Sequence, residues 1–343
     1  MGSDLLLVTA GHRLIHGSVE PGTARNYRSG LRKFEGYLEA VSARLLVLPP
    51  KCRSAHELHT LISTRGIVEG FVAYCALDGL SSKATSGYID GLKFYAVGLG
   101  GVATIPGFLV ISRMLEGLAK LGKRPSPKKL GIESDLVRRM VAELRYMDLS
   151  LYDLSLFTVL FSIAYFGCFR VSEFLISTDD MKMLRLDRVV FRKDGAFEFL
   201  LFKTKNNDRG PMQEVIFGPL GDDPICPVAA LRNFLGVRPP SPASLPLFIN
   251  ARGSPITPKV FNLMVRKVLH RLGFENVMRY SAKSFRVGAA SETYSLGFSF
   301  DDVKGLGRWN SDAFMEYILS GARASRARRI QLKLADHHRN KRV

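Results

Sequence analysis

Residues 280–320 read YSAKSFRVGAASETYSLGFSFDDVKGLGRWNSDAFMEYILS. Apolar residues in this stretch recur at helical intervals, which predicts three helices, over about Ser284–Leu296, Asp301–Leu306 and Ser311–Ser320. The same stretch collects side chains suited to chemistry: Lys283, Arg286, Arg308, Trp309 and Tyr317. Lys283, Arg286 and Arg308 thus precede Tyr317 on a run of short helices.

The sequence before this stretch changes its period twice. Helical spacing predicts a helix over about Ser134–Leu144 and a buried one within Leu154–Phe169. An Asp-Gly turn then predicts a hairpin, and helical spacing returns after it. The predicted later elements are the strands Val189–Arg192, Phe197–Lys203 and Gln213–Phe217 and the helices Ala229–Leu235 and Pro258–Leu272. We therefore expect a mainly α domain with a small antiparallel sheet (α+β) over residues 132–320.

Residues 17–121 predict a separate all-α domain. Four helical segments are expected, over about Thr23–Ala40, Ile67–Leu77, Ala84–Val97 and Val110–Leu121. In the first, Tyr27, Leu31, Phe34 and Leu38 are spaced as a core stripe. We expect residues 1–16 to be a flexible N-terminus, residues 122–131 (GKRPSPKKLG) an exposed basic linker, and residues 321–343 a basic tail.

The charge balance indicates a polyanionic partner. Lys and Arg number 49 against 31 Asp and Glu, giving +18 and a pI near 9.9, which favours nucleic acid. A basic protein without such a partner is the plainer alternative. The residues expected to contact DNA phosphates are Arg25, Arg28, Arg32, Lys33, Lys123, Arg124, Lys128 and Lys129.

Other classes of protein find little support. The apolar stretch Leu154–Phe169 is shorter than the roughly 20 residues that a membrane span needs. Cys52, Cys75, Cys168 and Cys226 show no disulfide or zinc spacing. The sequence shows neither a carboxylate cluster for two metals nor a Gly-rich nucleotide loop. We expect an intracellular protein, nuclear if eukaryotic, that uses no cofactor and no metal.

Residues 280–320 resemble the second conserved box of the tyrosine recombinases. In that family a His or Lys precedes an Arg by three residues, and a Tyr follows a Gly by ten. Lys283, Arg286, Gly307 and Tyr317 stand at those positions. Upstream, FGCFRVSEFL resembles the first box, with Arg170 followed after three residues by Glu173. The wording of SFRVGAAS and GRWNSDAFMEYI is most similar to eukaryotic mobile-element recombinases of the Crypton and DIRS kind.

Two positions depart from the family pattern. Lys283 replaces the usual His, so that an ammonium serves as electrostatic partner or acid. The residue after Gly307 is Arg308, where the family has His or Trp, while Trp309 supplies the usual side chain one residue later. In the family the His or Trp contacts the phosphate of the DNA strand that is cut. Either Arg308 or Trp309 could take this role, and we favour Trp309 because an indole N–H can donate from a packed position.

The resemblance implies a site-specific DNA recombinase or transposase that cuts and rejoins strands without metal or ATP. Tyr317 would be the nucleophile and form a 3′-phosphotyrosyl intermediate. Arg170 and Arg286 would clamp two non-bridging oxygens, with Glu173 bracing Arg170. Lys203, or alternatively Lys205, would protonate the departing 5′ oxygen. The expected partners are double-stranded DNA and further copies of the chain, a dimer on one site and a tetramer in the synaptic complex, with Leu319–Leu334 traded between neighbours.

Three other functions remain open. A type IB topoisomerase uses the same tyrosine chemistry without pairing sites. A domesticated DNA-binding protein would keep the fold but not catalysis. Binding of RNA by the Arg-rich tail is the third. Each candidate residue also has a plainer interpretation: Tyr317 as a core tyrosine, Arg170 as a helix cap, and Lys283 with Arg286 as a solvated basic face.

Overall fold

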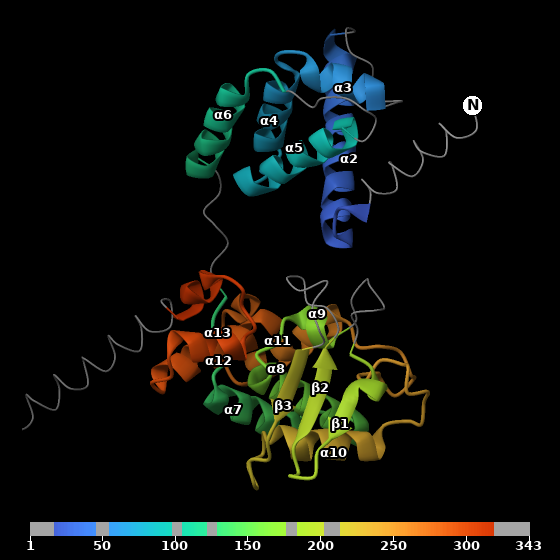
Figure 1. Ribbon diagram of the computed structural model, residues 1–343, viewed down its shortest axis with the longest axis vertical. Coiled ribbons are helices and arrows are strands. Elements are labelled where there is room, and N and C mark those ends of the chain that lie inside the picture. The colour runs from blue at the N-terminus through green and yellow to red at the C-terminus, as the bar shows by residue number, and fades with distance from the viewer. Residues whose placement is uncertain are drawn as a thin grey trace, which may run out of the picture. The chain divides into compact units, whose positions relative to one another are not determined.

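The computed structural model describes residues 17–45, 55–97, 105–121, 129–175, 184–201 and 213–318. Contacts divide the chain into two compact units, Met1–Ser126 and Pro127–Val343. The first unit contains helices only among its described residues, and the second combines helices with a three-stranded sheet (Figure 1). The expected fold class, mainly helical with a small antiparallel sheet, is confirmed.

The first unit has five described helices rather than the four expected. They are α2 (Pro21–Leu45), α3 (Ala55–Ser63), α4 (Ile67–Leu77), α5 (Ser82–Val97) and α6 (Phe108–Leu121). Helix α3 was not predicted, since its nine residues carry two His, a Glu and a Thr that obscure the apolar period. Phe34 and Leu38 of the expected core stripe are fully buried with Phe71, while Tyr27 and Leu31 are half-buried.

Helices α2 and α5 cross at close range because each contributes a glycine. A Cβ atom at Gly30 would meet the Tyr88 Cα at 2.8 Å, and one at Gly91 would meet the Tyr27 Cα at 2.8 Å. The absence of both side chains therefore allows the two backbones to touch, which fixes the helix that carries Arg25, Arg28 and Arg32.

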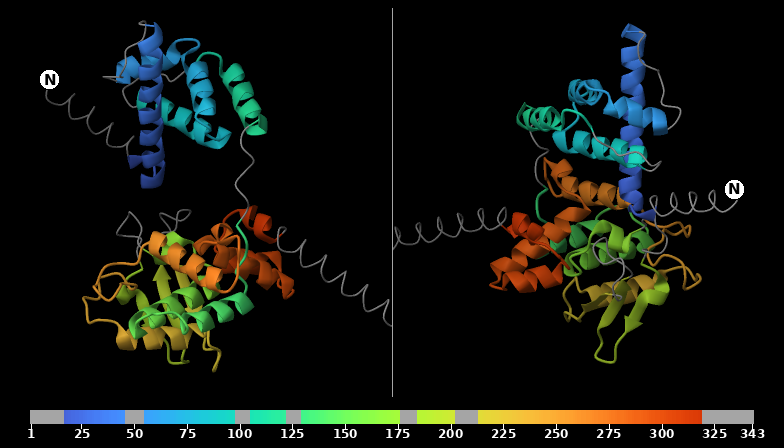
Figure 2. Two further views of the ribbon diagram at one scale, coloured as in Figure 1. Left: turned by 180° about the vertical axis from the view of Figure 1, so that it is seen from behind. Right: turned by 45° about the horizontal axis from the view of Figure 1, so that its top comes forward.

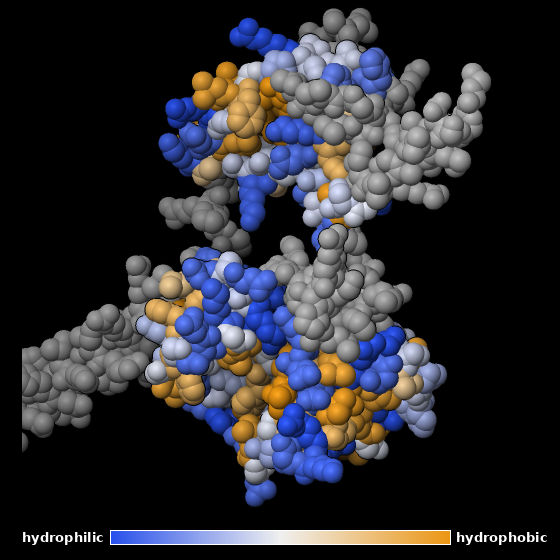
Figure 3. All heavy atoms as spheres, viewed as in Figure 1, coloured by the Kyte–Doolittle hydropathy of each residue, from blue (hydrophilic) through white to orange (hydrophobic). Residues whose placement is uncertain are grey.

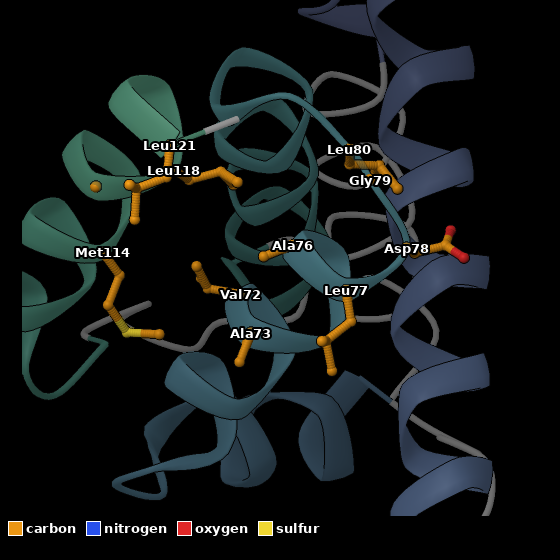
Figure 4. Close-up of a pocket in the computed structure, with 11 residues that line it drawn as sticks. Val72, Ala73, Ala76, Leu77, Asp78, Gly79, Leu80, Met114, Leu118 and Leu121 are labelled. Atoms are coloured by element: carbon orange, nitrogen blue, oxygen red, sulfur yellow. The ribbon is translucent and has the colours of Figure 1, made fainter. Parts of the chain in front are cut away.

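An apolar groove of about 930 Å³ separates α4 from α6 (Figure 4). Met114 and Leu118 of α6 face Val72 and Ala76 of α4 across it. Hydrophobic side chains are exposed over this part of the first unit (Figure 3), and Leu77 at the rim is 90% exposed. The groove contains one charged lining residue, Asp78.

The second unit is built around one buried helix. Its elements are α7 (Ser134–Leu144), α8 (Leu151–Phe166), α9 (Val171–Phe174), β1 (Val189–Phe191), β2 (Phe197–Leu201), β3 (Gln213–Phe217), α10 (Pro227–Val237), α11 (Pro258–Arg271), α12 (Ala282–Ser295) and α13 (Phe300–Leu306). Helix α8 packs against α7, α10 and α12. It is apolar on nearly all sides, as a central helix must be, and Ser150 caps its N-terminus by accepting from the Asp153 N–H at 3.0 Å.

The three strands form one antiparallel sheet in the order β1-β2-β3 (Figure 1). Val189 pairs with Phe199, and Phe197 pairs with Phe217. The predicted turn is present, since Gly195 has a φ of 84° and the Ala196 N–H bonds the Asp194 carboxylate. Inward-facing Phe199 and Phe217 contact Phe169, the residue before Arg170. Helices lie against this inner face of the sheet (Figure 2), while Glu214 and Ile216 on the outer face of β3 are exposed.

The last residues of the expected linker belong to the second unit. Leu130 N–H donates to the Arg279 carbonyl, and Ile132 N–H donates to the Ser284 carbonyl. Lys129 reaches the Met278 carbonyl at 2.7 Å. Residues 129–131 are therefore packed and partly buried rather than an exposed linker, and residues 122–128 lie outside the described chain.

The C-terminal helix begins differently from the prediction. Asp312–Phe314 form a 3₁₀ turn, and α-helical geometry starts at residue 315 and continues to the end of the described chain at residue 318. Residues 319–343, with the expected exchanged segment, lie outside the described residues. No single described helix has the length and apolar character of a membrane span; the bent pair His56–Ser63 and Ile67–Leu77 meets these two criteria only when its helices are joined across an 86° break.

We predict that Gly288→Ala destabilises the second unit. A Cβ atom there would collide with the backbone of Ile132, which cannot move without straining the hydrogen bonds from Leu130 to the Arg279 carbonyl and from Ile132 to the Ser284 carbonyl. Overpacking of this kind costs about 1–3 kcal/mol. Calorimetry of the full chain should show a lower melting temperature. Gly236→Ala is the matched control, because that helical glycine has nothing within 4 Å and the change should be neutral or stabilising by up to about 1 kcal/mol. Equal melting temperatures would contradict the prediction.

Candidate active site

The described candidate residues come from four separate segments of the second unit. Arg170 is the N-cap of α9 and Glu173 lies within it; Lys283 and Arg286 lie in the first turns of α12; Arg308 and Trp309 follow α13; and Tyr317 lies on the final helical turns. Lys203 and Lys205 lie outside the described residues. Hydrogen bonds and ring contacts among the described residues join these four segments into one cluster.

The carboxylate of Glu173 binds two arginines. Its Oε1 accepts from Arg170 Nη1 at 2.8 Å, and its Oε2 accepts from Arg308 Nη2 at 2.8 Å and from the Arg170 backbone N–H at 2.9 Å. Only 6% of the side chain is exposed. Burial alone would raise the pKa of Glu173, but the charge and hydrogen bonds of Arg308, with those of Arg170, outweigh burial and lower it. The carboxylate thus stays ionised and fixes Arg170.

Arg286 joins the same two segments through their backbones. Its Nη1 donates to the Cys168 carbonyl and its Nη2 to the Gly307 carbonyl, both at 2.5 Å, and the residue is 3% exposed. Burial, together with the positive charges of Arg170 and Arg308, lowers the pKa of Arg286 to about 10. The guanidinium is therefore charged at neutral pH. It binds Cys168, which lies 118 positions away in sequence, and Gly307, which lies 21 positions away.

Trp309 lies between Arg286 and Tyr317. The Arg286 guanidinium carbon is 4.0 Å from the Trp309 ring centroid, and the Trp309 and Tyr317 rings are 5.9 Å apart. On Tyr317 the Lys283 ammonium lies 5.1 Å from the ring centroid. Ser291 holds the backbone by donating to the Tyr317 carbonyl at 3.2 Å. Arg286, Trp309, Tyr317 and Lys283 are thus contiguous, with the phenol half-buried and Lys283 exposed.

The backbone at Arg308 is left-handed, with a φ of 55°. Arg308 N–H bonds the Gly305 carbonyl and Trp309 N–H bonds the Lys304 carbonyl. These two bonds form a Schellman motif at the end of α13, in which glycine is usual at the position that Arg308 occupies. A side chain there costs on the order of 1 kcal/mol or more.

The charged residues expected to contact DNA have different environments. Arg25, Arg28 and Arg32 are exposed on one face of α2. Lys33 pairs with Asp78 and lies 4.9 Å from the Tyr74 ring centroid, and the Asp78 hydrogen bond raises the pKa of Lys33. Lys129 is bonded to Met278, and Lys123, Arg124 and Lys128 lie outside the described residues. The face with Arg25, Arg28 and Arg32 is thus the most accessible of these sets.

Sequence reasoning missed a hydrogen-bonded trio that includes a residue of α12, the helix that carries Lys283 and Arg286. Glu292 of α12 accepts from Tyr165 Oη at 2.6 Å, from Ser134 Oγ at 2.6 Å and from the Ser134 N–H at 2.7 Å. Burial and the Glu292 hydrogen bond raise the pKa of Tyr165. This trio ties α7, α8 and α12 together. An acid on a helix with a small-residue pattern gives no sequence signal of such burial.

The described residues contain no group of three or more His, Cys, Asp and Glu side chains that could hold a metal ion. Cys75, Cys168 and Cys226 are buried free thiols. Burial raises the pKa of the Cys168 thiol to about 11, so at neutral pH it is not a nucleophile. The α4–α6 groove, with its apolar lining, is a poor place for phosphate chemistry. The Arg170–Tyr317 cluster is therefore the candidate site.

Solved structures with a similar fold are recombinases. No family sequence model matches the chain, and no curated protein matches it. The XerH site-specific recombinase bound to its difH substrate, before cleavage, gives a TM-score of 0.53 at 16% identity over 85% of this chain and 76% of that chain. The post-cleavage complex of XerH on palindromic difH gives 0.55 at 15% identity, over 85% and 75%.

A transposon protein gives a similar result. The Tn1549 transposon integrase in complex with circular intermediate DNA has a TM-score of 0.51 at 13% identity, over 93% of this chain and 98% of that chain. The fold of this chain is therefore the one found in tyrosine recombinases and integrases, as the resemblance of its two boxes implies. The Crypton and DIRS affiliation stays a prediction.

We predict that Glu173→Gln destabilises the second unit by about 3–5 kcal/mol at pH 7, because it leaves two partly buried guanidiniums without their counter-charge. Since the folded pKa of Glu173 lies below its ordinary 4.5, its stabilisation is complete above that pH and is lost as the pH falls through the folded pKa. The difference between wild type and variant should therefore shrink below pH 4.5, as urea unfolding at a series of pH values would measure.

The control for this prediction is Glu198→Gln. Glu198 pairs with Arg192 at the surface of the sheet, with the arginine 42% exposed, and such pairs contribute about 0–1 kcal/mol. Two results would show that the Glu173 carboxylate does not hold the cluster together. One is a loss of stability in Glu198→Gln as large as that in Glu173→Gln; the other is a difference between wild type and Glu173→Gln that stays constant below pH 4.5.

Proposed function

We propose that the chain is a site-specific DNA recombinase in which Tyr317 cuts and rejoins DNA through a 3′-phosphotyrosyl bond. The observation that carries the proposal is the cluster itself. Arg170, Arg286 and Tyr317 stand far apart in sequence, yet they meet through Glu173, the carbonyls of Cys168 and Gly307, and the Trp309 ring. Two guanidiniums beside a phenol are the groups that a metal-free attack on a phosphodiester needs.

The arginines can still bind a phosphate while they hold the site together. Each terminal guanidinium nitrogen carries two hydrogens, and the contacts of Arg286 use one on each. Arg170 keeps 25% of its side chain exposed. Planar N–H donors suit the paired oxygens of a phosphate. We therefore assign Arg170 and Arg286 to the two non-bridging oxygens, where negative charge builds up during attack.

The reaction balances without a cofactor. The Tyr317 oxygen forms a bond to phosphorus, its proton leaves, and the bond from phosphorus to the 5′ oxygen breaks and takes up a proton. The phosphodiester bond energy is kept in the tyrosyl ester for religation. Lys283, near the Tyr317 ring, stabilises negative charge on the phenol oxygen during attack. Lys203, with Lys205 as the alternative, is assigned to the departing 5′ oxygen.

Double-stranded DNA is the proposed substrate. The net charge of +18 and the exposed arginines of α2 support it, and the similar XerH and Tn1549 proteins were solved on DNA. We further propose a mobile element as the source of the chain, from the resemblance to Crypton and DIRS recombinases. Exchange between two sites requires four active tyrosines, so the working form would be a tetramer.

One alternative has specific support. Arg286 and Arg308 both spend donors on the protein itself, as they would in a chain that binds DNA and no longer cuts it. Activity on DNA without any target site would instead indicate a type IB topoisomerase. The assay below separates these functions from recombination.

We predict that wild-type protein forms a covalent adduct with nicked duplexes and that Tyr317→Phe does not. A pool of randomised duplexes is used because the target sequence is unknown. Each duplex carries one nick at a fixed position, and cleavage a few nucleotides before the nick releases a short 5′-hydroxyl fragment that diffuses away, so that religation fails. Adducts are detected by denaturing gel, and the trapped DNA is sequenced.

Three outcomes of that assay are informative. One enriched sequence supports recombination, and unselected adducts with relaxation of any plasmid support a topoisomerase. DNA binding without adducts supports the inactive alternative. Arg286→Lys should keep the charge but lose the planar donors, and should cut on the order of 100-fold more slowly. Tyr294→Phe, which removes a hydroxyl from the partly buried Tyr294 of the same unit, is the control and should leave the adduct yield unchanged.

We predict that Lys203→Ala slows cleavage of ordinary DNA but not of DNA with sulfur in place of the departing 5′ oxygen. A thiolate is a much weaker base than an alkoxide and leaves without a proton. Single-turnover rates on the two substrates measure the rescue. Lys205→Ala is the matched control two residues away. Rescue of Lys205→Ala alone would exchange the two assignments, and rescue of neither would remove both lysines from this role.

A further inference from the structure

The strained residue Arg308 points to a role that the recombinase resemblance does not assign. Glycine would form the turn after α13 without strain, yet the chain has an arginine at a φ of 55°. A residue held in such a conformation indicates that its side chain makes contacts that offset the strain. The contacts of this side chain therefore show what the arginine does.

The Arg308 guanidinium is turned into the protein. Nη1 donates to the Gly167 carbonyl at 3.0 Å and to the Leu306 carbonyl at 3.1 Å, and Nη2 donates to Glu173 at 2.8 Å. The guanidinium carbon lies 5.1 Å from the Phe169 ring centroid. Nη1 of Arg308 thus uses both of its hydrogens and Nη2 uses one, whereas Arg286 keeps one hydrogen on each terminal nitrogen. A pair of planar donors on the terminal nitrogens is therefore left for a phosphate on Arg286 and not on Arg308.

All of the Arg308 contacts outside its own turn lie on the segment that carries Arg170. Gly167 and Phe169 stand three residues and one residue before Arg170, and Glu173 accepts from both the guanidinium and the backbone N–H of Arg170. Arg308 also supplies the largest of the effects that keep Glu173 ionised against burial. Without Arg308, Glu173 would be a buried acid with one cationic partner in place of two.

We propose that Arg308 is a positioning residue, which orients Arg170 through Glu173 and does not itself contact the phosphate. This inference rests on the proposed function and refines it. In the family a His or Trp at this position donates a hydrogen bond to the phosphate. In this chain the donors to the phosphate would then be Arg170 and Arg286, and Arg286 stacks on Trp309. Trp309 orients Arg286 through its ring, and Arg308 orients Arg170 through a carboxylate.

The test is a double-mutant cycle between Arg308 and Glu173. Arg308→Gly removes the guanidinium and suits the left-handed backbone, so the turn itself is kept. Single-turnover adduct formation on a duplex selected by the wild type is measured for Arg308→Gly, Glu173→Gln and the double variant. Each single change should slow cleavage by up to about 100-fold. The double variant should be no slower than Glu173→Gln, and multiplied losses would overturn the proposal.

Two further measurements distinguish positioning from a general loss of structure. DNA affinity should be unchanged in Arg308→Gly. The pH below which the cleavage rate falls, which is the acid limb of the pH–rate profile, should be higher in this variant, because burial raises the pKa of Glu173 once Arg308 is gone. Arg308→Lys retains a charge for Glu173 and should keep the wild-type limb. A phosphate ligand would leave the limb in place in all variants. The control Arg271→Ala breaks a carboxylate pair and a carbonyl bond elsewhere in the unit and should cleave normally.

The failure of this inference can be told from the failure of the proposed function. If the wild type forms no adduct, the proposed function is wrong, and crystal structures of wild type and Arg308→Gly then decide the inference. Arg170 released from Glu173 in the variant would support it. Arg170 unmoved would overturn it, whatever the activity of the wild type.

Discussion

One buried carboxylate makes the candidate site possible. Three guanidiniums, from Arg170, Arg286 and Arg308, lie close together in the second unit, and the charges of Arg170 and Arg308 contribute to lowering the pKa of Arg286, since like charges repel strongly where water is scarce. Glu173 binds two of them directly, and backbone carbonyls accept from the third. The remaining excess of positive charge is what a phosphate would neutralise. A site held together by one negative charge against three positive ones is therefore prepared for an anion before any anion arrives.

The fold was largely predictable because its signals are local. The period of α7, the apolar run of α8, the Asp-Gly turn and the spacing of β3 each indicate one element from a few neighbouring residues. The bounds of α7 and β3 match the prediction, while α8 begins and ends three residues earlier than predicted. Helix α3 was missed because polar residues interrupt its stripe. The packing of residues 129–131 was missed because it depends on the glycine at position 288, far away in sequence. The Pro, Ser and Lys residues of the stretch 122–131 indicate a linker, and only the segment that residues 129–131 pack against shows that they are not part of one.

The residues of the candidate site were proposed from their ordered spacing, while the contacts between them were not predicted. Arg170, Glu173, Arg286, Trp309 and Tyr317 are joined by observed contacts, which their sequence positions anticipated through family resemblance and not through local chemistry. Nothing in the sequence indicates that Arg286 bonds two carbonyls, or that Arg308 turns inward, since both depend on backbone atoms that carry no sequence signal. The sequence left open whether Arg308 or Trp309 contacts the phosphate. The left-handed turn at Arg308 and its inward side chain support our proposal that Arg308 does not.

The bonds from Arg286 to the Cys168 and Gly307 carbonyls have a consequence for the newly made protein. A chain emerging from the ribosome presents residues 168–173 well before residues 286–308 exist outside the exit tunnel, and N-terminal parts generally fold first. Until the late segment arrives, Glu173 has Arg170 alone and the carbonyls of Gly167 and Cys168 lack their arginine donors. An incomplete chain therefore lacks both the phenol and the arrangement of cations around it. The cluster of cations around Glu173 can therefore assemble only after Arg286 and Arg308 have been synthesised.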